Sequence, residues 1–164
     1  MSRIKQGSMK ALTLRLQDEV FAIEAESVRE ILDLVPVTEV PNAPAYVGGL
    51  INVRGRVVPL ADLRVVFGME RPEPDEDTRI VVIETDVDGE PTVIGIIADK
   101  VHEVTEIDAA AVQDAPRVGM RWRPEFVAGI GKRRDDFLII PDLGRIFEFQ
   151  GAKAAPVAAE RTAS

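Results

Sequence analysis

Short runs of valine, isoleucine and leucine recur along the chain between turn-forming residues, and few of them keep a helical period beyond two turns. This pattern predicts many short strands and few helices. The expected strands are Ala11–Leu16, Val20–Ile23, Val37–Val40, Gly49–Val53, Val57–Leu60, Arg79–Thr85, Thr92–Ala98, His102–Ile107, Val127–Lys132 and Phe137–Ile140. The chain is therefore expected to be mostly β.

Turn-forming residues and short helical patterns fill the spaces between these strands. Helical turns are expected at Ala25–Leu32, Leu63–Phe67 and Leu143–Phe149. Hairpin connections are expected at Gln17–Glu19, Asp86–Glu90 and Arg133–Asp136, because short polar stretches between apolar runs favour tight turns.

The ends of the chain and one internal segment differ in composition from the rest. Arg71–Asp77 is rich in acidic residues and proline, which is typical of a solvated linker. The last residues, 151–164, are alanine-rich and nearly free of large apolar side chains, so a disordered tail is expected there. Residues 1–9 are expected to be a flexible N-terminus.

An internal repeat gives the domain organisation. Pro44–Leu50 matches Pro124–Ile130 at an offset of 80 residues (124 − 44), and the same offset relates Asp62, Leu63 and Phe67 to Asp142, Leu143 and Phe147. Val28–Ile31 matches Val101–Val104 at an offset of 73 (101 − 28). An insertion within Ala115–Arg123 reconciles the two offsets. Such short matches can arise by chance in a valine-rich chain, but several in one order favour a duplication.

The duplication predicts two similar β-subdomains within residues 10–150, at about Lys10–Gly68 and Thr78–Phe147. Units of five strands hide their edges by closing, so each subdomain is expected to be a small barrel.

Composition and charge narrow the classes of partner. The 164 residues correspond to about one domain, and they include no cysteine, which excludes disulfides and thiolate chemistry. A net charge of −8 argues against nucleic acid or an anionic membrane as the main partner. Since neither a spanning run nor a signal peptide is evident, the protein is expected to be soluble and cytoplasmic.

Candidate chemistry is sparse. His102, the one histidine, has no serine or carboxylate partner at a suggestive spacing. Gly129–Lys132 lacks the full phosphate-loop spacing, and Asp86–Gly89 lacks the later ligands of a calcium loop. Asp62 and Asp142 occupy equivalent repeat positions, which favours capping of the following helical turns over acid–base catalysis. We therefore expect neither an active site nor a bound cofactor or metal.

The stretch Asn52–Arg56 carries the strongest polar signal, because it places polar groups between two apolar runs. Arg54 and Gly55 are expected to form a tight turn, with Gly55 at positive φ and Asn52 bonded to the turn backbone. Glu30 is a candidate partner for the guanidinium of Arg54. These residues either only stabilise a hairpin or are displayed on rigid strands at a protein interface, where arginine is enriched.

Asn52-Val53-Arg54-Gly55, followed by Val57-Val58-Pro59-Leu60-Ala61-Asp62-Leu63-Arg64, resembles the signature of the CheW-like domain of bacterial chemotaxis coupling proteins. Supporting segments occur in the family's order: Phe21–Ile23, Val28–Ile31, Pro44–Gly49, Gly95–Val101 and Gly129–Ile130. Two positions depart from the family's usual pattern. Ala98 replaces a larger aliphatic residue, and Pro141 replaces the leucine that precedes the aspartate.

The resemblance implies two SH3-like, five-stranded β-barrels packed around a shared apolar seam, with short helices. It also implies a non-catalytic scaffold that couples methyl-accepting chemoreceptors to a CheA-type histidine autokinase and is recruited to membrane-associated receptor arrays. The family's kinase contacts fall on Val28, Glu30, Gly49, Asn52, Arg54 and Gly55. The receptor's helical tip is expected in an apolar groove between the barrels.

Two alternatives remain at this point. One is a coupling protein of the same fold that serves a non-flagellar array, in pilus motility or development. The other is a small-ligand barrel or a hydrolase that uses His102.

Overall fold

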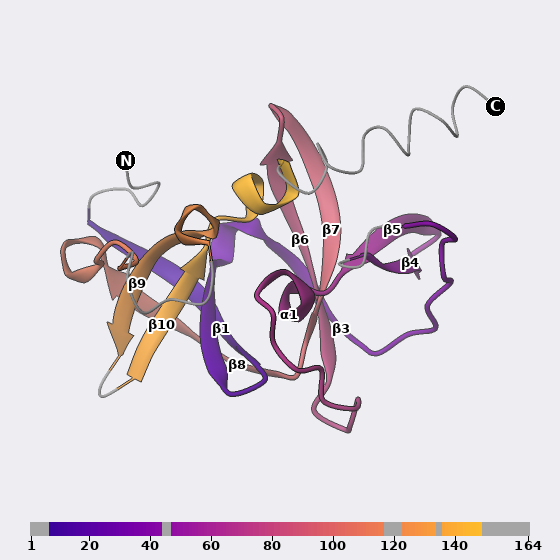
Figure 1. Ribbon diagram of the computed structural model, residues 1–164, viewed down its shortest axis with the longest axis horizontal. Coiled ribbons are helices and arrows are strands. Elements are labelled where there is room, and N and C mark those ends of the chain that lie inside the picture. The colour runs from indigo at the N-terminus through magenta and orange to yellow at the C-terminus, as the bar shows by residue number, and fades with distance from the viewer. Residues whose placement is uncertain (1–6, 44–46, 117–122, 134–135, 149–164) are drawn as a thin grey trace.

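The computed structural model describes residues 7–43, 47–116, 123–133 and 136–148 (Figure 1). The expected tail at 151–164, Pro44 and Tyr46 of the repeat, and the middle of the Arg133–Asp136 turn lie outside the described residues. Ten strands are present among these residues: β1 Ser8–Leu16, β2 Glu19–Glu24, β3 Val28–Asp33, β4 Val47–Val53, β5 Arg56–Ala61, β6 Arg79–Val87, β7 Glu90–Ala98, β8 Lys100–Asp108, β9 Val127–Arg133 and β10 Asp136–Pro141. The short helices are η1 Ala25–Ser27, α1 Leu63–Val66, η2 Ala109–Ala111, η3 Pro124–Phe126 and a helix over residues 143–148.

The mostly β fold is confirmed, but two expected elements differ from the structure. The helix expected at Ala25–Leu32 is wrong beyond Ser27, because Val28–Asp33 forms β3 and pairs with β6. The strand expected at Val37–Val40 is also wrong: Thr38 alone makes a bridge there, to Leu50. Pro36 and Pro41 flank this segment and have no N–H to extend a ladder. The flexible N-terminus expected at residues 1–9 overlaps β1, which begins at Ser8, and residues 1–6 lie outside the described residues.

The strands form two five-stranded sheets with the same internal arrangement. One has the order β3-β6-β7-β5-β4 and the other β8-β1-β2-β10-β9. In each, one pair is parallel, β5 with β7 and β10 with β2. We call them the β4–β5 barrel and the β9–β10 barrel, and they occupy the right and left halves of Figure 1.

The barrels exchange strands between the two repeats. Each repeat is a run of five strands, β1–β5 or β6–β10, but its first two strands pair with the last three of the other repeat. The expected subdomains at Lys10–Gly68 and Thr78–Phe147 therefore match the repeats and do not match the barrels. The physical reason is that sequence similarity marks equivalent strands and carries no information on which copy they pair with.

The equivalence of the barrels extends to their irregularities. A register shift interrupts the β3–β6 pairing between Val28 and Glu30, and a corresponding shift interrupts the β1–β8 pairing between Leu12 and Leu14. Each barrel closes through one bridge from the segment that follows its edge strand. Thr38 exchanges backbone hydrogen bonds with Leu50 of β4, and Gln113 does so with Ile130 of β9.

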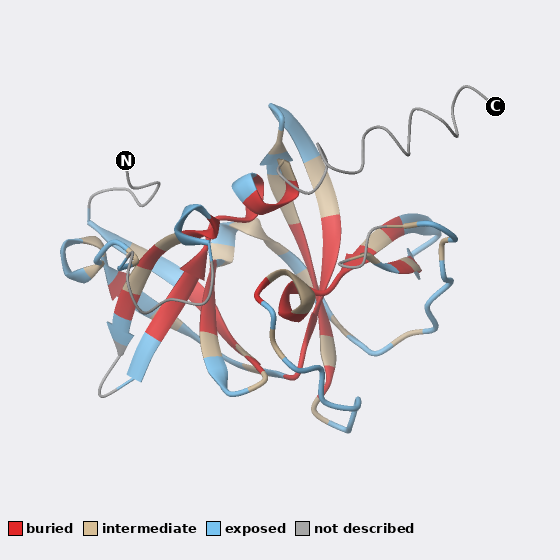
Figure 2. Ribbon diagram, viewed as in Figure 1, coloured by how far each residue is buried: buried red, intermediate tan, exposed pale blue. Residues whose placement is uncertain are grey.

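The largest hydrophobic core lies between the barrels and not inside either one. It joins Leu12, Leu14 and Leu16 of β1 to Val81 and Ile83 of β6. It also includes Leu63 of α1 and Leu143, Ile146 and Phe147 of the helix over residues 143–148. The rings of Phe21 and Phe67 meet there with centroids 5.2 Å apart. Smaller clusters fill the two barrel interiors. Figure 2 shows the buried residues concentrated along the central parts of the strands.

A buried ion cluster connects α1 to Asp99, where the chain passes from β7 in one barrel to β8 in the other. Both guanidinium edges of Arg64 are used: Nε and Nη2 donate to Oδ1 and Oδ2 of Asp62 at 2.9 Å, and Nη1 donates to Oδ1 of Asp99 at 2.6 Å. Asp99 lies between β7 and β8, and its Oδ2 accepts the backbone N–H of Gln17 at 2.7 Å. Burial alone would lower the pKa of Arg64, but the hydrogen bonds and charges of Asp62 and Asp99 outweigh it and raise that pKa.

Because each barrel contains strands of both repeats, neither repeat should fold alone. We predict that fragments 1–73 and 74–164, divided within the exposed Arg71–Pro74 segment, are unfolded separately and regain β structure as a one-to-one complex when mixed. Circular dichroism and gel filtration measure this. A 1–73 fragment with Phe21→Asp is the control that should fail to reassociate. A cooperative unfolding transition in either fragment alone would contradict the strand exchange.

Replacing Arg64 with methionine leaves the carboxylates of Asp62 and Asp99 buried without their cation. We predict that Arg64→Met lowers the free energy of unfolding by roughly 3–5 kcal/mol, as measured by chemical denaturation. The matched control is Arg145→Met, since the Arg145 side chain is 63% exposed, and it should change stability by less than about 0.5 kcal/mol. Equal effects of the two substitutions would show that the cluster is not stabilising.

Candidate protein-interaction site

The polar residues that the sequence analysis singled out lie in the hairpin between β4 and β5. Arg54 and Gly55 form its two-residue turn with φ of 53° and 85°. Two successive positive φ values match the twist of the flanking strands, and glycine is the favoured second residue. Oδ1 of Asn52 accepts the backbone N–H of Gly55 at 2.8 Å. The turn, the positive φ of Gly55 and the role of Asn52 are all confirmed.

Arg54 projects from this turn toward Glu30 of β3. Its Nη2 lies 3.2 Å from Oε1 of Glu30, and its Nε lies 3.3 Å from Oε2. This hydrogen bonding, with the charge of Glu30, raises the pKa of Arg54 above its ordinary value. The Arg54 side chain is nevertheless 80% exposed and that of Glu30 25% exposed. The guanidinium is thus oriented by one carboxylate and still open to a partner.

A cleft of about 370 Å³ lies beside this pair at the open end of the β4–β5 barrel. Its apolar lining comes from Val53, Val58, Val82 and Val93, and its charged lining from Arg29, Glu30, Arg54, Arg56 and Glu84. Arg29 pairs with Glu84. Sequence reasoning singled out Arg56 with the hairpin but missed Arg29 and Glu84, which become neighbours only through the pairing of β3 with β6. An apolar floor with a charged rim is typical of protein interfaces.

The six residues that the resemblance indicated do not lie together on the surface. Glu30, Asn52, Arg54 and Gly55 do lie together, because the Arg54 side chain in the hairpin turn reaches Glu30 of β3, the strand at the other edge of the sheet. Val28 is half-buried and packs against the core between the barrels.

Gly49 is buried under the segment before β4, and its φ is 139°. A Cβ there would lie 2.4 Å from the carbonyl oxygen of Thr38. Since Gly49 is not exposed, any effect on binding passes through the position of that segment.

Large hydrophobic side chains are also exposed at equivalent positions of the two barrels. Val57 of β5 is 72% exposed, and its counterpart Phe137 of β10 is 67% exposed. Ile31 of β3 and its counterpart Val104 of β8 are exposed as well. The two barrels thus expose apolar side chains at the same positions of their repeats.

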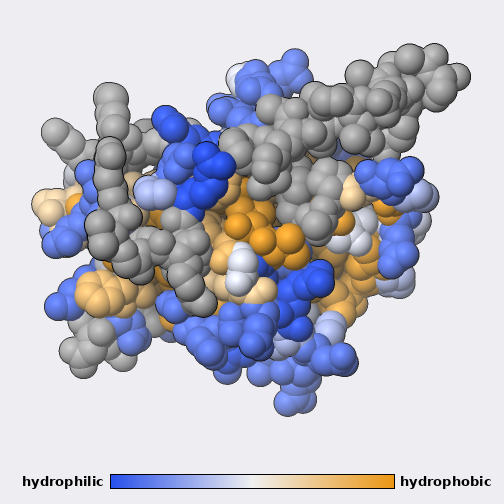
Figure 3. Space-filling view, in the orientation of Figure 1, coloured by the Kyte–Doolittle hydropathy of each residue, from blue (hydrophilic) through white to orange (hydrophobic). Residues whose placement is uncertain are grey.

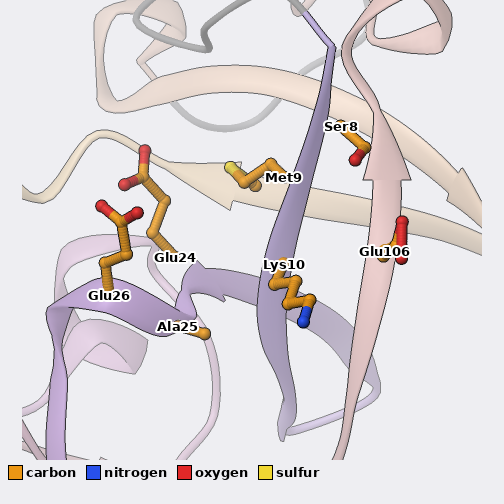
Figure 4. Close-up of a pocket in the computed structure, with 7 residues that line it drawn as sticks. All are labelled: Ser8, Met9, Lys10, Glu24, Ala25, Glu26 and Glu106. Atoms are coloured by element: carbon orange, nitrogen blue, oxygen red, sulfur yellow. The ribbon is translucent and has the colours of Figure 1, made fainter.

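Another pocket, of about 520 Å³, is lined by both charged and apolar side chains (Figure 4). Glu24 and Glu26 stand on one side, Ser8 and Glu106 on the other, and Met9 and Lys10 of β1 lie between them. Figure 3 shows hydrophobic surface near the middle of the molecule, with hydrophilic residues around it.

The described residues carry little that suggests catalysis. His102 lies on β8. The described residues contain no group of three or more side chains that could hold a metal ion. Asp62 caps α1 by accepting the N–H of Arg64, and Asp142 accepts the N–H of Arg145, so both have the predicted capping role. Among the described helices, none is long and apolar enough to cross a membrane.

Comparison with known proteins agrees with this architecture. The family model described as the CheW-like domain matches residues 10–150. The chain is 30% identical to a probable chemotaxis protein CheW of Rhizobium etli and 29% identical to the chemotaxis protein CheW of Rhizobium meliloti, in each case over 93% of this chain and 96% of the relative. A more distant relative is the protein PilI of Pseudomonas aeruginosa, 26% identical over 80% of this chain and 72% of that protein.

A solved structure has the same fold. The crystal structure of the scaffolding protein TtCheW from Thermoanaerobacter tengcongensis aligns with a TM-score of 0.77 and 32% identity. The alignment covers 89% of this chain and 91% of that one. Together with the family match over most of the chain, these findings establish that this protein belongs to the CheW-like domain family.

Proposed function

We propose that this chain is a non-catalytic adaptor of a chemotaxis signalling array, which holds the regulatory domain of a CheA-type histidine kinase close to chemoreceptors. Membership of the CheW-like family supports this role, as do relatives that are named chemotaxis proteins and a neighbour described as a scaffolding protein. The observation that carries the proposal is the exposed guanidinium of Arg54, held by Glu30 on a rigid hairpin.

The kinase-binding surface of the proposal consists of Glu30, Asn52, Arg54 and Gly55. Val28 and Gly49 would act on it indirectly, through the positions of β3 and β4. Asn52 and Gly55 fix the turn, so the guanidinium reaches a partner with little conformational freedom left to lose. Arginine presents a planar fork that pairs with carboxylates in two parallel hydrogen bonds. The partner surface is therefore expected to offer a carboxylate beside apolar side chains.

The receptor contact of the proposal lies where the two barrels meet. The hydrophobic surface in the middle of the molecule (Figure 3) supports docking of an apolar helix face there. Such a contact would recruit the adaptor to membrane-associated receptor arrays without inserting it into the bilayer. In this role, the stiff connection between the barrels transmits a small receptor displacement to the kinase.

A second candidate is an adaptor of a non-flagellar chemosensory array, and the similarity to PilI is the observation that favours it. The two functions use the same surfaces and differ in their partners. Co-purification from native cells distinguishes them, because the kinase and receptors recovered with the chain belong to one pathway or the other. Recovery of neither a histidine kinase nor a receptor would contradict both.

Arg54→Ala should weaken binding of the kinase regulatory domain about tenfold while leaving the midpoint of thermal unfolding essentially unchanged. The reason is that an exposed ion pair contributes little to stability, whereas an arginine at an interface often contributes much to binding. Isothermal titration calorimetry measures the affinity. Lys132→Ala removes the same charge from an exposed position of β9 and is the control. If Arg54→Ala binds with the same affinity as the unmodified chain, Arg54 does not contribute to the interface.

Gly49→Ala should lower both stability and kinase affinity, because an added Cβ collides with the backbone of Thr38 and shifts the segment before β4. We expect the free energy of unfolding to fall by roughly 1–3 kcal/mol, a typical cost of a strained backbone. Gly48→Ala is the matched control, since its Cβ would lie 3.5 Å from the Leu60 side chain, an ordinary contact. If both variants unfold at the same denaturant concentration, the close approach at Gly49 has no energetic consequence.

A further inference from the structure

Arg56, the first residue of β5, lines the cleft beside the Arg54–Glu30 pair and is exposed. The other charged residues of that lining form two ion pairs, Arg54 with Glu30 and Arg29 with Glu84. Within the part of the chain that the structure describes, the Arg56 side chain takes part in neither an ion pair nor a hydrogen bond. Three arginines and two glutamates give the lining a net charge of +1 (3 − 2), whereas the whole chain carries −8. Arg56 therefore supplies the uncompensated charge of this cleft.

The strand registers place the Arg56 side chain over the apolar floor of the cleft. Arg56 lies directly opposite Val53 in the β4–β5 ladder, and the side chains of such a pair lie on the same face of the sheet. Val53 is buried in the interior of the β4–β5 barrel, as is Val58, two residues after Arg56. The Arg56 side chain thus leaves the sheet on its inner face, at the open end of the barrel, whereas the exposed Val57 side chain leaves on the outer face.

The two carboxylates of the lining lie on the same inner face. Glu30 is opposite Val82, which is buried in the barrel interior, and Glu84 follows Val82 by two residues. Each carboxylate is engaged by an arginine other than Arg56, because Glu30 binds Arg54 and Glu84 binds Arg29. The chain therefore leaves the Arg56 guanidinium to be neutralised by a group from outside.

The apolar floor sets a condition on what can bind. Val53, Val58 and Val82 are all buried, so a side chain that covers them also removes water from the guanidinium above them. Removing water from a cation that has no counter-ion is unfavourable. A ligand that brings a carboxylate offsets this cost and can form two parallel hydrogen bonds with the guanidinium. The cleft consequently favours an apolar side chain with an acidic residue beside it, and it disfavours a basic or purely apolar segment.

We propose that Arg56 determines the specificity of this cleft by pairing with a carboxylate of the kinase regulatory domain, while a neighbouring apolar side chain of that domain covers the valines. The inference rests on the function proposed above, because it takes that domain as the occupant. The role differs from that of Arg54, whose guanidinium is already oriented by Glu30 within the chain. A cleft of about 370 Å³ admits a few side chains and not a whole secondary-structure element.

Calorimetric titration of the full chain with the kinase regulatory domain tests the pairing. Arg56→Gln should weaken binding about five- to tenfold, and the remaining affinity should depend less on salt concentration, because salt screens the ion pair that has been lost. Arg56→Lys keeps the charge without the planar fork and should recover most of the affinity. Arg71→Gln removes the same charge from an exposed position between the repeats and is the control that should bind like the unmodified chain.

The Arg56→Lys variant also identifies the partner residue. A carbodiimide activates a carboxylate, and an amine in contact with it then forms an amide bond while the carbodiimide leaves as a urea. Mass spectrometry of the treated complex should find residue 56 joined to an aspartate or glutamate of the kinase domain. Replacing that residue with alanine should weaken binding to the unmodified chain and add little to the effect of Arg56→Gln, because the two changes remove one interaction.

An affinity of Arg56→Gln equal to that of the unmodified chain would overturn the inference, as would fully additive effects of the two changes. Coupling of residue 56 only to Glu30 or Glu84 of its own chain would overturn it too. If Arg54→Ala still weakens binding in these cases, the proposed kinase surface stands without Arg56. If neither Arg54→Ala nor Arg56→Gln changes the affinity, the kinase does not contact this cleft and both proposals fail.

Discussion

Strands β1 and β6 are buried on both faces, with one face against a barrel interior and the other against the core between the barrels. Residues 11–14 and 80–83 are consequently buried without interruption. This double burial follows from the exchange of strand pairs between the repeats, because each exchanged pair completes one barrel and packs against the other. The two barrels cannot separate without exposing Phe21, Phe67 and the leucines of β1 to water. The rigidity on which a scaffold depends comes from this seam.

The surface of the β4–β5 barrel depends on that rigidity. β5 pairs with β7, and β3 pairs with β6, so the hairpin that carries Arg54 and the strand that carries Glu30 both rest on the exchanged pair. The hairpin can then hold Arg54 at a positive φ, which costs a non-glycine residue conformational energy. The buried Arg64 cluster fixes α1 to the connection between β7 and β8, since Arg64 donates two hydrogen bonds to Asp62 and one to Asp99. A guanidinium thus has a structural role in the seam and, in our proposal, a recognition role on the surface.

Much of the fold followed from local patterns. Apolar runs bounded by turn residues located nine strands, and Asn52-Val53-Arg54-Gly55 indicated the hairpin, its hydrogen bond and the ion pair with Glu30. The pattern at Ala25–Leu32 was misleading because Val28, Ile31 and Leu32 have helical spacing, whereas in β3 the residues alternate and Ile31 faces solvent. The burial of Gly49 and the exchange between repeats were also not predictable. Both arise from contacts between segments distant in sequence, and neither changes the local composition.

Hydrogen–deuterium exchange of the chain, alone and saturated with the kinase regulatory domain, tests most directly whether a rigid double barrel presents this surface to a partner. Our account predicts added protection in β3 and in the hairpin between β4 and β5, with the slow exchange of β1 and β6 unchanged. Absence of protection in the hairpin, or faster exchange in β1 and β6 on binding, would contradict it.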